Sequence, residues 1–492
     1  MAQRNLKDLF SKLPSFIQDV RKRIRIPLLK SPPQWSPVYQ IMGKWVLVVL
    51  ALMVASMSCL APCSASSFFK DKPWERKRPI LSVPTASSSF ASSSIVLPLQ
   101  GNVYPNGFYN VTLYVGQPPK PYFLDPDTGS DLTWLQCDAP CQQCTETLHP
   151  LYQPSNDLVP CKDPLCMSLH SSMDHRCENP DQCDYEVEYA DGGSSLGVLV
   201  RDVFPLNLTN GDPIRPRLAL GCGYDQDPGS SSYHPMDGIL GLGRGAVSIV
   251  SQLHNQGIVR NVVGHCFNSK GGGYLFFGDG IYDPYRLVWT PMSRDYPKHY
   301  SPGFGELMFN GRSTGLRNLF VVFDSGSSYT YFNAQAYQVL TSLLNRELAG
   351  KPLREAMDDD TLPLCWRERK PIKSLRDVRK YFKPLALSFS SGGRSKAVFE
   401  IPIEGYMIIS SMGNVCLGIL NGTDVGLENS NIIGDISMQD KMVVYNNEKQ
   451  AIGWATANCD RVPKSQVSSW VGETCNDAIE DVTNATEQVA VL

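Results

Sequence analysis

The chain has 492 residues, of which 42% are hydrophobic and 19% charged, and its formal net charge is −3. This composition supports a sizeable core in two or three domains, or in one large two-lobed domain, and it excludes global disorder. Residues 1–44 hold nine Lys and Arg against two acidic residues, whereas the remainder holds 36 basic and 46 acidic residues. An acidic body argues against a nucleic-acid partner.

The first predicted element is an uncharged apolar run at residues 45–61, shorter than the ~20 residues of a spanning helix and followed by small residues. It is typical of a signal peptide cleaved near Ala65, with Met42 as a candidate true start. The alternative is a signal anchor that keeps residues 1–44 in the cytosol, as in a single-pass type II membrane protein. In both cases residues 1–65 direct the body into the secretory pathway, toward the extracellular space (apoplast) or the vacuole.

Residues 66–95 are rich in Ser and Pro and carry a cluster of basic side chains. The segment is interpreted as either a propeptide that masks an acidic cleft or a solvated linker. The basic residues of this cluster are Lys70, Lys72, Arg76, Lys77 and Arg78.

From about Ile95 the sequence changes to short apolar runs with a period near two, such as FYNVTLYVG and GYLFFGDG, separated by Gly, Pro, Asn and Asp. This pattern predicts an all-β body with a few short helices. The clearest helix is expected at residues 334–349, and a second within residues 372–384.

A weak internal repeat indicates two lobes. FLDPDTGSDLTW (residues 123–134) is echoed by VVFDSGSSYTYF (residues 321–332), and each copy is followed by an apolar-apolar-Gly segment. Gly241 lies 114 residues after Asp127, and Gly434 lies 110 residues after Asp324. We expect an N-terminal lobe at residues 96–290, a C-terminal lobe at 291–460 and an acidic tail at 461–492.

Two carboxylates on matching loops can share one proton, because like charges at close range push their pKa values apart. The ionised member can then take a proton from water while its partner polarises a peptide carbonyl. Residues around each Asp are expected to shape the tight turns and orient the carboxylates: Thr128, Gly129 and Ser130 in the first loop, and Ser325, Gly326 and Ser327 in the second.

These motifs resemble the pepsin-type aspartic endopeptidases, over roughly residues 100–460. The resemblance implies a bilobal all-β fold, catalytic residues Asp127 and Asp324, and hydrolysis of polypeptides at acidic pH. It also implies a β-hairpin flap carrying Tyr189, whose hydroxyl is bonded by the indole of Trp134. No metal or organic cofactor is implied, and a monomer is expected.

The cysteines narrow the resemblance to the atypical nucellin-like or nepenthesin-like plant members, with twelve candidates for disulfides and Cys475 left over in the tail. The twelve are Cys137, Cys141, Cys144, Cys161, Cys166, Cys177, Cys183, Cys222, Cys266, Cys365, Cys416 and Cys459. Disulfides fit the oxidising secretory pathway. Sequons add four candidate glycosylation sites, at Asn110, Asn207, Asn421 and Asn484.

Two other motifs have competing interpretations. The Cys137-x3-Cys141-x2-Cys144 spacing also occurs at iron–sulfur sites, but that chemistry belongs to a reducing compartment. Residues 193–197 match the G-x-S-x-G nucleophile elbow, yet a strand pattern follows where an elbow needs a helix.

The strongest alternative to an enzyme is a catalytically silent binding or inhibitor protein of the same fold, and it rests on Pro126. Proline lacks a backbone N–H, so we expect a lost sheet hydrogen bond and a slight displacement of Asp127.

Overall fold

The computed structural model describes residues 93–170, 179–227, 229, 236–390 and 396–463. The expected targeting region, the basic cluster at 70–78, Cys177, Cys475 and Asn484 lie outside these residues. Across the described ranges, no helix has the length and apolar character needed to cross a membrane.

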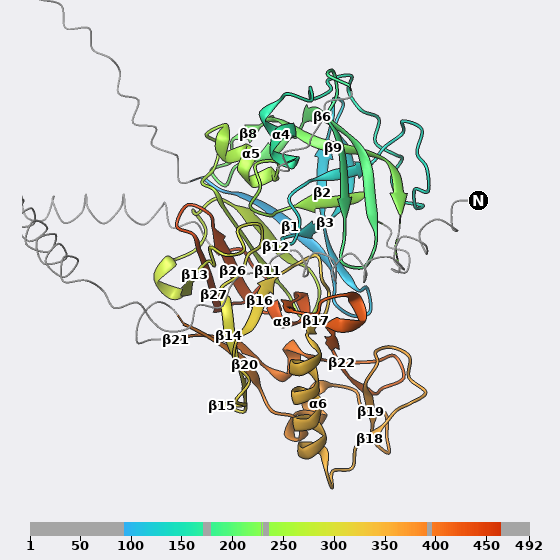
Figure 1. Cartoon of the computed structure of the whole chain (residues 1–492), viewed down its shortest axis with the longest axis vertical. Helices are drawn as coiled ribbons and strands as arrows, with labels where there is room; N and C mark the ends of the chain where they lie inside the picture. Colours follow the sequence, from blue (N-terminus) through green and yellow to red (C-terminus); the bar gives the residue numbers. More distant parts are fainter. Residues whose placement is uncertain (1–92, 171–178, 228, 230–235, 391–395, 464–492) are drawn as a thin grey trace, which may run out of the picture. The chain divides into compact units, whose positions relative to one another are not determined.

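The larger sheet joins strands from both ends of the described chain (Figure 1). Its thirteen strands, in spatial order, are β13 (Val288–Pro291), β27 (Ala451–Thr456), β26 (Lys441–Asn446), β11 (Val262–Phe267), β12 (Gly273–Phe277), β1 (Ile95–Asn102), β2 (Phe108–Val115), β3 (Lys120–Asp127), β10 (Gly238–Gly241), β4 (Trp134–Gln136), β9 (Arg217–Asp227), β6 (Ser194–Val203) and β5 (Asp184–Glu188).

The C-terminal lobe has a sheet of its own. In spatial order its strands are β21 (Lys396–Ile401), β20 (Leu385–Ser390), β14 (Gly303–Phe309), β16 (Leu319–Phe323), β25 (Ser430–Ile433), β17 (Thr330–Phe332) and β24 (Ile419–Asn421), with β15 (Arg312–Ser313) pairing β14. A small sheet contains β18 (Arg354–Glu355), β19 (Cys365–Arg367), β23 (Val415–Leu417) and β22 (Met407–Ile409), and β7 (Leu206–Asn207) pairs β8 (Pro213–Ile214).

Among the described residues the helices are short, apart from α6 (Ala334–Leu348), which confirms the helix expected at 334–349. The Asn333 side chain caps α6 by accepting a hydrogen bond from the Ala336 N–H, and the buried apolar residues recur every fourth position. The expected second helix is confirmed as α7 (Leu375–Val378) with the 3₁₀ turn η3 (Arg379–Tyr381). The remaining helices are α4 (Pro164–Leu169), α5 (Ile249–Asn255), α8 (Asp435–Met438) and the 3₁₀ turns η2 (Pro284–Arg286), η4 (Ile403–Gly405) and η5 (Gly422–Val425).

The lobes share the larger sheet, because the C-terminal strands β26 and β27 continue it. β26 pairs antiparallel with β11, and β27 pairs with both β26 and β13. The expected boundary at residue 290 therefore falls inside β13 (Val288–Pro291), a strand of this shared sheet. The boundary expected from the sequence separates the two repeats, but the larger sheet contains strands from both sides of it.

Disulfides occur in the cysteine-rich part of the first lobe, within the second lobe and between the two, as the cysteine pattern predicts. The bonded pairs are Cys137–Cys222, Cys141–Cys144, Cys166–Cys183, Cys266–Cys459 and Cys365–Cys416, and Cys161 is also disulfide-bonded. Since Cys137, Cys141 and Cys144 are all in disulfides, their spacing does not form an iron–sulfur site.

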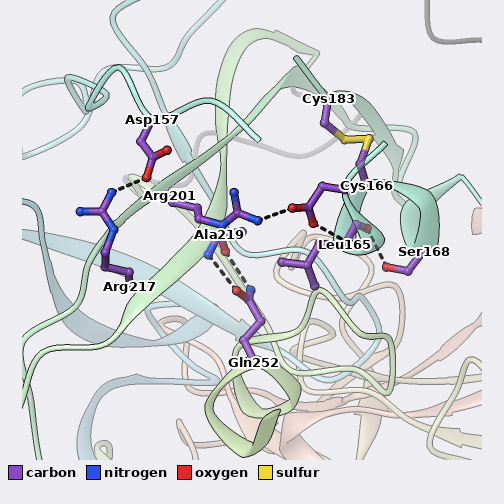
Figure 2. Close-up of polar contacts among 10 residues, drawn as sticks. Asp157, Leu165, Cys166, Ser168, Cys183, Arg201, Arg217, Ala219 and Gln252 are labelled. Atoms are coloured by element: carbon purple, nitrogen blue, oxygen red, sulfur yellow. Dashed lines mark hydrogen bonds and ion pairs between the residues drawn. A yellow bond between two sulfur atoms is a disulfide. The ribbon is translucent and has the colours of Figure 1, made fainter. Parts of the chain in front are cut away.

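Helix α4 is fastened to the base of a hairpin formed by β5 and β6 (Figure 2). Arg201 on β6 donates a hydrogen bond to Asp163, the residue that caps α4, at 2.5 Å between Nη2 and Oδ2. Cys166 on α4 is bonded to Cys183, directly before β5. On the neighbouring strand β9, both backbone groups of Ala219 bond to the side-chain amide of Gln252. The base of the hairpin is therefore held from several sides.

Pro126 lies within β3 without interrupting the parallel pairing to β10. The carbonyls of Phe123 and Asp127 accept hydrogen bonds from the β10 side, at 2.9 and 2.8 Å. Backbone groups alternate along a strand, so position 126 faces the other edge, toward β2. The β2–β3 ladder has ended by then, at Leu124. The expected loss of a sheet hydrogen bond at Pro126 is therefore not seen in the β3–β10 ladder, and the β2–β3 ladder does not reach this position.

Candidate active site

Asp127 and Asp324 occupy matching places in the two lobes. Asp127 ends β3, which lies parallel to β10, and Asp324 directly follows β16, which lies parallel to β25. The ends of the two paired strands also match, because the N–H groups of Gly241 and Gly434 each donate a hydrogen bond to a threonine hydroxyl, that of Thr133 at 3.1 Å and that of Thr330 at 3.2 Å. The internal repeat of the sequence thus becomes a structural repeat.

The two Asp loops are locked together by hydrogen bonds between Thr128 and Ser325. Each backbone N–H donates to the hydroxyl of the other residue, at 3.1 Å from Thr128 and 2.9 Å from Ser325. The Thr128 hydroxyl donates to the Phe323 carbonyl, and the Ser325 hydroxyl donates to the Pro126 carbonyl at 2.6 Å. Four bonds between buried groups fix the spacing of the lobes at the carboxylates.

Within each loop, the glycine and the serine that follows it turn toward the carboxylate. Asp127 accepts from the Gly129 N–H at 2.7 Å and from the Ser130 hydroxyl. Asp324 accepts from the Gly326 N–H at 3.0 Å and from the Ser327 hydroxyl at 3.3 Å. Hydrogen bonds of this kind stabilise the ionised form of a carboxylate.

The loops approach so closely that only glycine fits at two positions. A Cβ added to Gly129 would lie 2.6 Å from Oδ1 of Asp324, and one added to Gly326 would lie 2.5 Å from Oδ1 of Asp127. Each glycine therefore lies directly against the carboxylate of the opposite loop.

The electrostatics favour one shared proton. Burial, and then the nearby charge of Asp127, raise the pKa of Asp324, and a hydrogen bond between the two carboxyls acts in the same direction. The N–H of Gly326 and the hydroxyl of Ser327 lower it in part. Asp324 therefore retains a proton in conditions where an ordinary aspartate is ionised.

The hairpin of β5 and β6 carries Tyr189 over the carboxylates. Its turn is closed by the Tyr189 N–H donating to the Gly193 carbonyl at 2.8 Å. The Trp134 indole N–H donates to the Tyr189 hydroxyl at 2.7 Å, which is the contact expected from the sequence. Residues 194–203 form strand β6, so the G-x-S-x-G stretch leads into a strand and not a helix.

A cleft of about 720 Å³ runs past both carboxylates and under the hairpin. It brings together Asp127, Asp324, Trp134 and Tyr189, along with Gly129, Ser130, Gly326 and Ser327; Thr128 and Ser325 are buried beneath it.

Two further acids near the carboxylates were missed by the sequence reasoning. Asp125 lines the cleft, two positions before Asp127 on the same strand. Asp435 is buried at the start of α8, and its Oδ1 lacks a hydrogen-bond partner within the described part of the chain. Burial raises the pKa of Asp125, and the charges of Asp127 and Asp324 raise it further. Burial also raises the pKa of Asp435, and the charges of Asp125, Asp324 and Asp127 raise it further. Period-two alternation was the signal available for Asp125, because i and i+2 share a face of a strand.

The candidate glycosylation sites differ in exposure. Asn110 is 8% exposed, within β2, so its burial argues against a glycan at that position. Asn207 is exposed, and Asn421 is partly exposed, with its amide donating to Asp424 at 2.9 Å. Two clusters of possible metal ligands, Cys166–His170–Cys183 and Asp359–Cys365–Cys416, each contain a disulfide that already uses both sulfurs.

Comparisons with known proteins agree with this geometry. Residues 109–279 match the family described as "Xylanase inhibitor N-terminal", and residues 309–456 match "Xylanase inhibitor C-terminal". An aspartic proteinase of Oryza sativa subsp. japonica is 47% identical over 390 residues, covering 76% of this chain and 93% of that protein.

More distant relatives extend the similarity. Aspartic proteinase nepenthesin-1 of Nepenthes gracilis is 26% identical over 377 residues, covering 72% of this chain and 78% of its own length. The crystal structure of the aspartic proteinase from Irpex lacteus superposes with a TM-score of 0.53 at 17% identity, over 74% of this chain and 98% of that one. At that identity the likeness shows the fold.

Proposed function

Since the chain belongs to the pepsin-like aspartic proteinase family and is an aspartic endopeptidase by its relatives, we propose that it hydrolyses polypeptides at acidic pH through the dyad of Asp127 and Asp324. The observation that carries the proposal is the pair of carboxyls in hydrogen-bonding contact, on loops joined by reciprocal bonds between Thr128 and Ser325.

In the proposed reaction the two carboxyls have different roles. Asp127, which accepts hydrogen bonds from Gly129 and Ser130, is the carboxylate that removes a proton from water. Asp324, with its raised pKa, donates its proton to the oxygen of the peptide carbonyl as the water oxygen bonds to the carbon. The C–N bond then breaks, the amine leaves with the proton that Asp127 took up, and one hydroxyl of the tetrahedral intermediate returns its proton to Asp324 to form the carboxylic acid product.

The position of the hairpin of β5 and β6 beside the cleft supports the proposed hydrolysis. Tyr189 lines the cleft and is held by Trp134, so closure of the hairpin over a peptide excludes water from the reacting atoms.

The compartment belongs to the same proposal. The disulfides and the apolar run at 45–61 support passage through the secretory pathway. The basic cluster at 70–78 would act as a propeptide that masks the acidic cleft, and protein sequencing of the mature N-terminus tests this. A fully active enzyme that begins upstream of Lys70 contradicts masking.

The test of the proposed function is cleavage of a mixed peptide library by the purified body from pH 3 to pH 9, with and without pepstatin. We expect activity to fall as pH rises through the pKa of the protonated carboxyl. Asp127→Asn and Asp324→Asn should each lower kcat by about 10³-fold or more, because each removes one partner of proton transfer. Thermal unfolding of the variants serves as the folding control.

Full activity in either variant contradicts the dyad. A wild type that is inert on every peptide favours a binding protein of the same fold, the function named in the matching xylanase inhibitor family.

A further inference from the structure

One wall of the cleft is a row of three side chains on adjacent strands. Asp125 on β3 is in register with Ile239 on β10, and Ile239 is in register with Trp134 on β4. All three line the cleft. Because Asp125 precedes Asp127 by two positions on one strand, both side chains point to the same face of the sheet. The row therefore lies directly beside the reacting carboxylates.

The opposite lobe has the equivalent row without a charge. Val322, two positions before Asp324, is in register with Ile432 on β25, and Ile432 is in register with Tyr331 on β17. These residues also line the cleft, and Phe320 packs with Val322 and Ile432. The subsite on this side of the dyad is apolar.

Asp125 has no cation to pair with. Among the described residues that line the cleft none is Lys or Arg, and His299 is the one imidazole. Within the same described ranges the Asp125 carboxyl has neither a hydrogen bond nor an ion pair, and the groups that act on it, Asp127 and Asp324, are both acidic. The ionised form of a partly buried carboxyl in this setting is costly, which raises its pKa, and a ligand cation would stabilise that form.

We propose that the subsite of Asp125, Ile239 and Trp134 binds a Lys or Arg side chain of the substrate, while the row of Val322, Ile432 and Tyr331 binds an apolar one. Cleavage then falls between a basic and an apolar residue. This specificity rests on the proposed function, since both subsites flank its dyad.

The chemistry of the subsite fits a long basic side chain. Lys and Arg place an apolar stem along apolar surface while the charged head reaches a polar group, here along Ile239 and Trp134 toward Asp125. A charge-assisted hydrogen bond in a partly desolvated site is among the stronger single contacts in proteins.

The selectivity for a cation depends on pH in a defined direction. Asp125 binds a cation when it is ionised, and burial together with Asp127 and Asp324 raises its pKa; Asp435 faces the same cluster. The advantage of a basic side chain therefore grows as pH rises through the pKa of Asp125. A neutral side chain at the same position gains no such advantage.

The test uses uncleavable peptides with a reduced bond in place of the scissile amide, so that it does not depend on turnover. Ligands carry Lys or its uncharged analogue norleucine on one side of that bond and Phe on the other, in both orders. At pH 6 we expect the wild type to bind the better Lys ligand about 10- to 100-fold more tightly than its norleucine counterpart. Equal affinities for Lys and norleucine in both orders overturn the proposal.

The variant Asp125→Asn should bring the two affinities within about threefold. The control Asp212→Asn removes the same charge from an exposed loop position outside the cleft and should keep the preference. A preference that survives Asp125→Asn overturns the assignment to Asp125.

Cleavage of the corresponding ordinary peptides separates the two proposals. Selective binding that depends on Asp125, without cleavage, supports the subsite and contradicts the proteolytic function. Cleavage with no discrimination between Lys and norleucine supports the function and overturns the subsite.

Discussion

The two sides of the cleft have nearly identical loops and different walls. Both Asp loops place a glycine N–H and a serine hydroxyl on the carboxylate, and each glycine lies against the opposite carboxylate. Two residues before the Asp of each loop, however, one lobe has Asp125 and the other Val322. The hydrogen bonds that hold each carboxylate come from a glycine N–H and a serine hydroxyl of its own loop, not from the side chain two positions earlier. Substrate choice can therefore change in one lobe while the dyad stays symmetric.

The largest loss of activity should come from substitutions in the two Asp loops, which are the part of the cleft that the lobes share. In Gly129→Ala the new Cβ would meet the Asp324 carboxylate at 2.6 Å, well inside the normal 3.4 Å contact, and Gly326→Ala does the same to Asp127 at 2.5 Å. A displacement approaching 1 Å costs about 100-fold in rate. We expect similar losses of kcat in both variants, measured on one peptide, with circular dichroism unchanged. A loss in only one of them would show that the loops are not equivalent.

Thermal stability should depend on pH through acids of both lobes. Burial and the dyad raise the pKa of Asp125, Asp324 and Asp435 in the folded state. A folded-state pKa above the unfolded one stabilises the fold fully at low pH, and this stability is lost as pH rises through the folded value. We expect Tm to fall by about 5 °C or more between pH 4 and pH 8.

Calorimetry of two variants measures how much of this decrease in Tm comes from an acid of each lobe. Asp125→Asn and Asp435→Asn should each make the decrease in Tm shallower, since each removes one group with a raised pKa. Glu306 and Asp359 have lowered pKa values, both about 2, so their effect on Tm appears at lower pH than this range. A Tm that rises between pH 4 and pH 8 contradicts the sign.

The hairpin of β5 and β6 belongs to the first lobe alone, and substitutions that loosen it should reduce activity less than those in the Asp loops. Trp134→Phe removes the indole N–H that holds the Tyr189 hydroxyl at 2.7 Å. The loss of one hydrogen bond predicts a roughly 10-fold rise in KM with a smaller change in kcat. Tyr189→Phe should match it, and the double variant should be no worse than either, because both remove the same bond.

The smallest effect is expected at Pro126. Its carbonyl accepts from Ser325, and any residue at this position can provide that group. Its missing N–H faces an edge where the ladder has ended. Pro126→Val should therefore change kcat by less than about threefold. A large gain in kcat would show that the proline does displace Asp127.

Much of the site follows from local sequence, and what was missed depends on tertiary contacts. The repeated Asp-Thr/Ser-Gly-Ser motif predicted both loops, and the spacing to the apolar-apolar-Gly segments predicted their supporting strands. The reciprocal bonds of Thr128 and Ser325 join residues 197 positions apart, so no local pattern contains them. Alternation places Asp125 beside Asp127, but only the folded sheet shows that this face borders a cleft. The sequon at Asn110 likewise carries no information on burial.

The position of β26 and β27 in the larger sheet has a consequence for biosynthesis. These strands, residues 441–456, are made last among the described elements, yet β26 pairs with β11 of the first lobe. The second Asp loop also needs a late segment, because the Asp324 N–H donates to the Ile433 carbonyl. A nascent chain still short of these residues holds both aspartates without the framework that brings them together. Nearly the whole chain must therefore be synthesised before the two Asp loops can be brought together.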